Sequence, residues 1–99
     1  MEKVGCIYIL TNQHKTVLYI GVTSDLYSRI TEHKHKQYPN AFTKKYNCNR
    51  LVYYETFYTI DEAITREKAL KKWNRQWKER LINEYNPTWK DLFEEIKMW

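Results

Sequence analysis

The stretch that decides the fold runs from residue 4 to residue 22 and reads VGCIYILTNQHKTVLYIGV. Two runs rich in Ile, Val, Leu and Tyr, Val4 to Thr11 and Val17 to Val22, flank the polar run Asn12 to Thr16. Apolar runs separated by a short polar connection are typical of two strands joined as a β-hairpin. The hairpin is therefore the first predicted element of the fold.

Two tyrosines stand out in this hairpin. Side chains alternate between the faces of a strand, so Tyr8 shares a face with Cys6 and Leu10, and Tyr19 shares one with Gly21. The two rings converge if the register aligns these faces, whereas a slip of one residue sends one tyrosine to the opposite face. The five-residue connection leaves the register open.

The rest of the chain predicts helices and one more strand. Hydroxyl and acidic residues open a helix of about residues 25–35, and a polar, basic loop over 36–50 carries a helical turn near 41–46. Residues 51–58 predict a third strand, and a capping box at Thr59 and Glu62 opens a helix over 60–73. Further helices are predicted from Asn74 to Asn86 and from Thr88 to about Lys97. The fold class is α/β (α+β), a three-stranded sheet flanked by helices in one domain of residues 1–99.

Charged side chains interrupt the apolar faces of two predicted helices. Arg29 and His33 share a stripe with Leu26 and Ile30. Glu67 lies in a row of apolar residues at helical spacing, namely Ile60, Ala63, Ile64 and Leu70. A carboxylate in such a row needs a partner. The alternative to a functional role is that Glu67 pairs with Lys71, and Arg29 with Asp25 or Glu32, as weak surface ion pairs.

The composition limits the class of binding partner and the cellular compartment that we expect. Seventeen Lys and Arg against twelve Asp and Glu give a net charge of +5, which favours a polyanionic partner such as DNA, with RNA not excluded. Cys6 and Cys48 lack any C-x-x-C spacing, and the N-terminus does not read as a secretory leader, so a reduced, cytoplasmic protein is expected. No apolar run approaches the ~18 residues that span a bilayer, so no membrane contact is expected.

The polar residues on these faces suit phosphodiester cleavage. Glu67 is a natural ligand for a hard cation such as Mg²⁺ (or Mn²⁺), and the Arg29 fork matches a phosphate. Tyr8 or Tyr19 is the candidate to deprotonate water, provided that nearby positive charge favours the phenolate. His33 is a candidate to assist as acid or base, or to hydrogen-bond a tyrosine.

These residues resemble the GIY-YIG nuclease superfamily, through Cys6-Ile7-Tyr8, Tyr19-Ile20-Gly21, Arg29 and Glu67. Longer segments resemble its small stand-alone bacterial branch, which is similar to the catalytic domain of excision-repair endonucleases. They are residues 27–33, 42–46, 66–68 and 86–92.

The resemblance implies an antiparallel three-stranded sheet and one divalent metal. It also implies endonucleolytic hydrolysis of DNA by in-line attack of water, with a link to DNA repair or processing. It carries the site over to Tyr8, Tyr19, Arg29 and Glu67, places His33 where relatives have His or Tyr, and offers Asn83 or Asn86 as a further lining residue.

Two departures favour a second reading. Cys6 stands where the first motif calls for glycine, and Val22-Thr23 stands where many relatives have lysine. The alternative is therefore a non-catalytic nucleic-acid-binding module with a degenerate site, and a third class is a protein-interaction subunit whose tyrosines only pack.

Surface cations and tryptophans complete the expectations. Lys44, Lys45 and Lys71 are the candidate nucleic-acid contacts, although such lysines are also ordinary solvated surface. Lys72 and Arg75 have the same two readings. The tryptophans at positions 73, 77 and 89 are expected to pack rather than to stack on bases.

Overall fold

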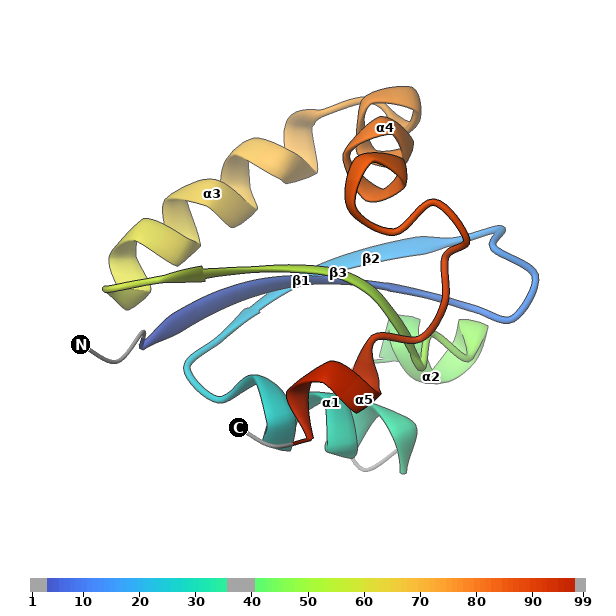
Figure 1. The fold of residues 1–99 in the computed structure, drawn as a ribbon, viewed down its shortest axis with the longest axis horizontal. Coiled ribbons are helices and arrows are strands. Elements are labelled where there is room, and N and C mark those ends of the chain that lie inside the picture. Colours follow the sequence, from blue (N-terminus) through green and yellow to red (C-terminus); the bar gives the residue numbers. More distant parts are fainter. Residues whose placement is uncertain (1–3, 36–40, 98–99) are drawn as a thin grey trace.

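The computed structural model describes residues 4–35 and 41–97. Its three strands are β1 (Gly5–Thr11), β2 (Leu18–Thr23) and β3 (Arg50–Phe57). The helices are α1 (Leu26–Lys34), α2 (Ala41–Tyr46), α3 (Ile60–Lys72), α4 (Arg75–Tyr85) and α5 (Phe93–Ile96). Figure 1 shows α3 and α4 above the sheet, and α1, α2 and α5 below it. The predicted fold class is confirmed.

The sheet is antiparallel with strand order β2-β1-β3, so β2 and β3 are its edges. In the hairpin register Tyr8 lies opposite Gly21, and Leu10 lies opposite Tyr19. Tyr8 and Tyr19 are therefore diagonal neighbours on one face, within reach of each other for aromatic side chains. The convergence left open by the sequence is confirmed.

Strand alternation divides the buried side chains between the two faces of the sheet. The lower cluster packs under α1 and α5 and holds Cys6, Tyr8, Leu10, Leu26, Ile30, Cys48, Leu51, Leu92 and Ile96. The upper cluster packs under α3 and α4 and holds Ile7, Ile9, Ile20, Val52, Tyr53, Ala63, Leu70, Ile82 and Trp89. Cys6 fills space in the lower core, so the motif position that lacks glycine is accommodated by packing.

A bulge lets β3 serve both clusters. Its register against β1 shifts between Ile9 and Leu10, so that Val52 and Tyr53 both join the upper cluster while Leu51 turns to the lower one. An extra residue in one strand re-aims the side chains that follow it. Periodicity alone does not reveal this shift.

Side-chain caps fix the helix starts, as predicted for α3 and α4, whereas α1 is capped by Asp25 and not by the hydroxyl residues before it. Asp25 accepts from the backbone N–H of Ser28 at the start of α1, and Thr59 and Glu62 form a reciprocal capping box at the start of α3. Asn74 caps α4 by accepting from the N–H of Trp77. Each cap satisfies donors that a helix otherwise leaves unpaired. The region of 36–40 in the predicted basic loop lies outside the described residues, and the helical turn is confirmed as α2.

Three expectations about helices need correction. Ile60 is 37% exposed and Trp77 is 50% exposed, so neither side chain is buried although helical spacing places both on an inward stripe. The predicted last helix is reduced to α5, because Asp91 accepts from the N–H groups of Leu51 and Phe93. Local side-chain bonds of this kind compete with helix formation.

The described helices are all too short or too polar to cross a bilayer.

Candidate active site at the β2 edge

Tyr8 is the buried centre of the site. Its side chain is fully buried, and a hydrogen bond of 3.2 Å joins its hydroxyl oxygen to Nε2 of His33. Gly21 makes this position possible, since a Cβ there would lie 2.3 Å from the Tyr8 hydroxyl oxygen. The glycine of the second motif is thus required by the tyrosine of the first.

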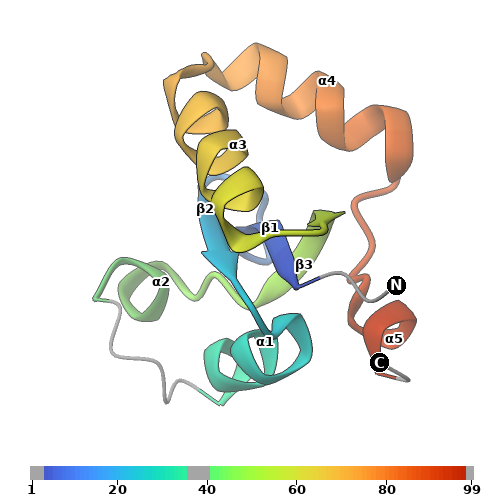
Figure 2. The same ribbon diagram turned by 90° about the vertical axis from the view of Figure 1, so that its left-hand side faces the viewer.

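Tyr19 is the half-buried member of the same cluster. Its ring centroid lies 6.3 Å from that of Tyr8, 5.9 Å from that of His33 and 5.9 Å from that of Phe42. Unlike Tyr8, it also lines an open pocket at the β2 edge, together with Leu18, Ile20, Phe42, Lys71 and Lys78. Because β2 has no further strand beside it, side chains from both faces of the sheet meet there. Figure 2 looks along the strands, with α3 above β2 and α2 to the left of it.

His33 is buried on α1, one helical turn after Arg29. Burial, and secondly the positive charge of Arg29, lower the pKa of His33 to about 4. The imidazole is therefore neutral at pH 7. This state suits a hydrogen bond to Tyr8.

Arg29 lies at the margin of the cluster. Its side chain is 27% exposed, and Nε lies 3.4 Å from Oε1 of Glu32, an i,i+3 ion pair on α1. An ion pair between partly exposed side chains is weak. Its influence on His33 places the guanidinium charge beside the tyrosine cluster, where a phosphate can meet it.

Glu67 approaches from the upper layer, on α3. Its side chain is only 13% exposed, and Oε2 lies 3.0 Å from Nζ of Lys71. The i,i+4 ion pair with Lys71, which the sequence offered as a non-functional alternative, is therefore present. Lys71 also lines the Tyr19 pocket, so this ion pair connects the Glu67 carboxylate to the β2 edge. The edge thus gathers Tyr19 from the strand and the Lys71–Glu67 pair from the helix above it.

The side chains of the described residues limit how a metal ion could be bound. Among the described residues, no group of three or more His, Cys, Asp or Glu side chains could hold an ion. A single carboxylate such as that of Glu67 is compatible with Mg²⁺, which keeps several waters and uses one or two carboxylates together with substrate phosphates.

Other residues singled out from the sequence lie elsewhere. Asn86 is buried and donates to the carbonyls of Val52 and Lys90, and Asn83 accepts from the indole N–H of Trp89. Both serve the β3 side of the fold. Lys44 and Lys45 are exposed on α2, the helix whose Phe42 contacts Tyr19.

Arg75 has a structural task. It pairs with Glu79 at 2.7 Å and donates to the carbonyls of Lys15 and Thr16, each at 2.8 Å. One guanidinium thereby ties the β1–β2 connection to α4.

Sequence reasoning missed two residues that line the Tyr19 pocket, Phe42 and Lys78. Phe42 opens one of the segments that carry the family resemblance, which was the available signal. Lys78 gave none, because its place depends on how α4 packs beside α3.

Comparison with known proteins decides the family. Residues 4–90 match the GIY-YIG catalytic domain. The chain belongs to the GIY-YIG family. This family is a nuclease superfamily, and its two motif tyrosines are the pair that the β1–β2 hairpin brings together here.

Several GIY-YIG relatives share the compact size of this chain. A UPF0213 protein of Staphylococcus saprophyticus is 40% identical over 67 residues, which cover 68% of this chain and 80% of that protein. A UPF0213 protein of Autographa californica nuclear polyhedrosis virus is 40% identical over 83 residues, 82% of this chain and 78% of that protein. One of Staphylococcus aureus is 39% identical over 67 residues, with the same coverage as the first. No solved structure matches the chain.

Proposed function

We propose that the protein is a divalent-metal-dependent endonuclease that hydrolyses DNA phosphodiester bonds at the β2 edge, on branched or flapped DNA of the kind handled in repair. The observation that carries this proposal is the shared pocket. Tyr19 and Lys71 line it together, and Lys71 is paired with Glu67. A proton acceptor, a cation and a carboxylate are thereby presented at one open edge.

Tyr19, rather than Tyr8, is the phenol suited to meet water. Tyr8 is fully buried and bonded to His33, whereas Tyr19 opens onto the pocket. Lys71 and Lys78 line that pocket, and neighbouring positive charge favours the phenolate, the form of a tyrosine that can accept a proton. Tyr8 and His33 are then positioning residues that hold the Tyr19 ring.

The hydrolysis step follows from these roles. The water oxygen attacks phosphorus while its proton passes to the phenolate oxygen of Tyr19, and the bond from phosphorus to the leaving oxygen breaks, the leaving oxygen keeping the electron pair and taking a proton from solvent. Arg29 binds the charge that builds on the other phosphate oxygens, a contribution that is often the largest single one in such reactions. Glu67 would hold Mg²⁺ (or Mn²⁺), which supplies charge neutralisation at the phosphate.

The Lys71–Glu67 pair bears on how the metal binds. Because the carboxylate is paired with Lys71 at 3.0 Å, the lysine must yield when a cation binds. A hard divalent cation next to a carboxylate is a far stronger partner than a half-exposed lysine. The pair therefore holds Glu67 in place until the metal and DNA arrive.

A cleavage screen tests the proposal. Purified protein is incubated with duplex, flapped and branched DNA in Mg²⁺, Mn²⁺ or a chelator, and nicking is followed on denaturing gels. We expect nicking only with metal, and its loss in Glu67→Ala with the fold intact by circular dichroism. Glu94→Ala, which removes an exposed carboxylate on α5, is the matched control. Nicking by Glu67→Ala at the wild-type rate contradicts the metal role.

The pairing of Glu67 with Lys71 also favours the alternative of a non-catalytic nucleic-acid-binding module. That function predicts DNA binding with a steep dependence on salt and no cleavage on any substrate in the screen.

A further inference from the structure

The positive charge of this protein is concentrated on one corner. The segment 68–80, which joins the end of α3 to the first half of α4, holds six Lys and Arg and one Glu. Its net charge of +5 equals that of the whole chain, since the remaining residues carry eleven charges of each sign. The α3–α4 corner is therefore a strongly basic part of the chain, which suits a polyanionic ligand.

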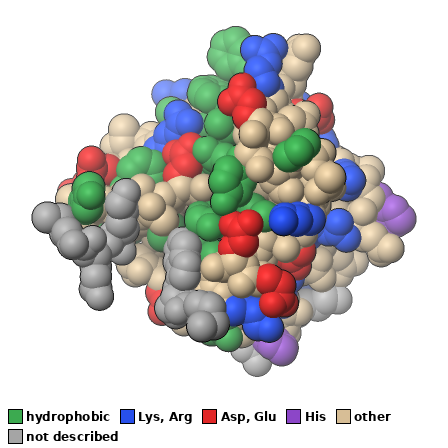
Figure 3. Space-filling view, in the orientation of Figure 1, with side chains coloured by type: hydrophobic (Ala, Val, Ile, Leu, Met, Phe, Trp, Pro, Cys, Tyr) green, Lys and Arg blue, Asp and Glu red, His purple; other side chains and the backbone are tan. Residues whose placement is uncertain are grey.

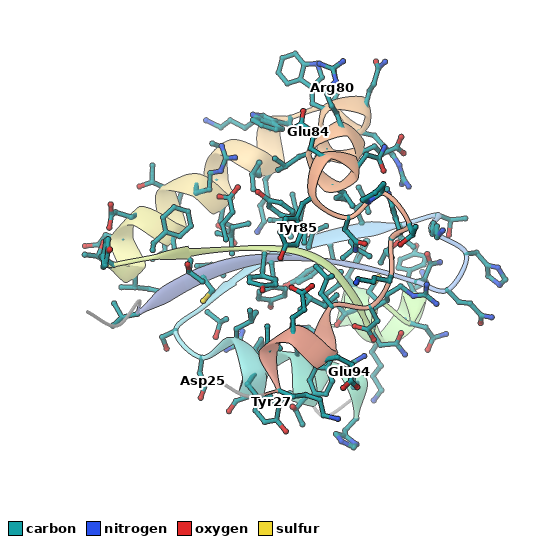
Figure 4. All side chains as sticks on the ribbon, viewed as in Figure 1. Asp25, Tyr27, Arg80, Glu84, Tyr85 and Glu94 are labelled. Carbon is teal, nitrogen blue, oxygen red and sulfur yellow. The ribbon has the colours of Figure 1, made fainter. Side chains whose placement is uncertain are left out.

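Some cations of this corner have tasks in the fold and others face solvent. Arg75 ties down the hairpin connection, and Lys71 pairs with Glu67. Lys68, Lys72 and Arg80 are exposed. Figure 4 shows Arg80 at the top of α4, away from the sheet.

An exposed tryptophan lies among these cations. Trp77 is 50% exposed and lines an open groove of about 200 Å³ together with Trp73, Arg80, Leu81 and Glu84. Figure 3 shows apolar and basic side chains next to each other at the top of the molecule, over α4. A large ring in this setting is costly to leave in water unless it has a partner.

The indole of Trp77 is held from behind. It meets the half-buried Trp73 edge to face, with ring centroids 5.9 Å apart. Trp73 in turn carries Arg66 over its ring at 5.3 Å, and Arg66 forms two hydrogen bonds of 2.9 and 3.1 Å to Glu55. This row of contacts fixes the ring before any ligand arrives, which lowers the entropy cost of stacking on it.

The groove adjoins the proposed active site. Lys78 lines the Tyr19 pocket, and the residue before it, Trp77, lines the groove. Trp77 and Lys78 are consecutive in the first half of α4, so both hollows border on the same turn of that helix.

We infer that Trp77 is a stacking platform for an unpaired base, and that the α3–α4 corner binds the single-stranded arm of a DNA whose junction with duplex lies at the Tyr19 pocket. Lys72, Lys78 and Arg80 contact the phosphates of that arm. Aromatic stacking combined with basic side chains is the usual chemistry of single-strand binding. This inference rests on the proposed function and narrows its substrate to DNA that carries an unpaired arm.

Binding without cleavage tests the inference separately from the nuclease activity. Affinities for a forked DNA and for a blunt duplex of equal length are measured in chelator, with wild type, Trp77→Ala and Trp77→Phe. Wild type should prefer the forked DNA. Trp77→Ala should lose about five-fold or more of its affinity for the forked DNA and little for the duplex, because stacking acts only on the unpaired base. Trp77→Phe, which keeps a flat ring, should retain part of the preference.

Two further variants separate stacking from charge and from folding. Lys72→Ala should weaken binding to the forked DNA and lower its salt dependence, because it removes a phosphate contact with the arm, whereas Trp77→Ala should leave the salt dependence unchanged. Tyr58→Ala, which removes another ring about half exposed, should leave the preference unchanged. Tryptophan fluorescence provides a second readout, since quenching by the forked DNA should be smaller in Trp77→Phe than in wild type.

Equal losses on both DNAs in Trp77→Ala, or an unchanged preference, overturn the inference even if the protein cleaves DNA. A preference that depends on Trp77 in a protein that never cleaves supports the inference and contradicts the proposed nuclease. Binding of a forked RNA as tightly as the forked DNA overturns the restriction to DNA.

Discussion

The two edges of the sheet differ in what their polar side chains do. At the β3 edge, Glu55 accepts from Arg66 and from Tyr53, and Tyr54 and Tyr85 both donate to Glu95. At the β2 edge, Tyr19 and Lys71 line an open pocket instead. The first edge is closed by its own hydrogen bonds, and the second presents its polar groups to a ligand.

The electrostatics of the β3 edge agree with a structural task. Burial and the neighbouring Glu55 raise the pKa of Tyr53, and burial, Tyr85 and Glu95 raise the pKa of Tyr54. Both phenols stay protonated as donors at any physiological pH. The comparison teaches that polar residues of similar type bond to one another at the β3 edge and line an open pocket at the β2 edge.

Substitution of the two motif tyrosines is the strongest test of the difference between buried and open positions. Tyr19→Phe should lower the single-turnover cleavage rate by about 100-fold or more, the usual contribution of a general base. Tyr8→Phe should mainly cost about 1 kcal/mol of unfolding free energy, because it removes one buried hydrogen bond. Rates and denaturant unfolding are measured on both proteins. A larger loss of rate in Tyr8→Phe would reverse the two roles.

Arg29 is the residue proposed to stabilise the transition state at the β2 edge. Arg29→Ala should lower the cleavage rate by about 100- to 1,000-fold, as removal of one group that stabilises developing charge commonly does. Its affinity for DNA should fall much less. The partner in its surface ion pair offers the control, since Glu32→Gln should retain the rate. Equal rates in Arg29→Ala and wild type would remove Arg29 from the site.

His33 lies between the buried interior of the protein and the β2 edge. Its pKa is about 4 in the folded protein against 6.5 for an unperturbed histidine, so the unfolded chain binds the extra proton between these values. Stability should therefore be complete above pH 6.5 and fall by at most ~3 kcal/mol as the pH drops to 4. His33→Phe should flatten this part of the profile, measured as unfolding free energy at several pH values. His14→Gln, which alters an exposed ring, should keep the wild-type slope.

Much of this arrangement could be predicted from the sequence. Alternation in the hairpin allowed Tyr8 and Tyr19 to share a face, subject to a register that the sequence left open, and the capping box at Thr59 marked where a helix begins. These signals are local, so a single sequence contains them. Burial of His33 likewise follows from its place beside Ile30 on the helical stripe.

What could not be predicted depends on tertiary packing. The bulge at Val52 and Tyr53 depends on which cluster each side chain enters, and the exposure of Trp77 depends on where α4 leaves the sheet. The pairing of pocket residues Phe42 and Lys78 joins α2 and α4, which are distant in the chain. Helical spacing placed Trp77 inward because it says nothing about where the neighbouring layer ends.

The most direct test compares one glutamate from each edge. Single-turnover cleavage at saturating Mg²⁺ is measured for Glu67→Gln and Glu55→Gln, corrected for the folded fraction. The account predicts that Glu67→Gln loses about 100-fold or more in rate while its stability stays near wild type. Glu55→Gln should keep its rate and lose about 1–3 kcal/mol of unfolding free energy, since Arg66 loses its charged partner. A wild-type rate in Glu67→Gln, or an equal loss of rate in both variants, would contradict the assignment of chemistry to the β2 edge.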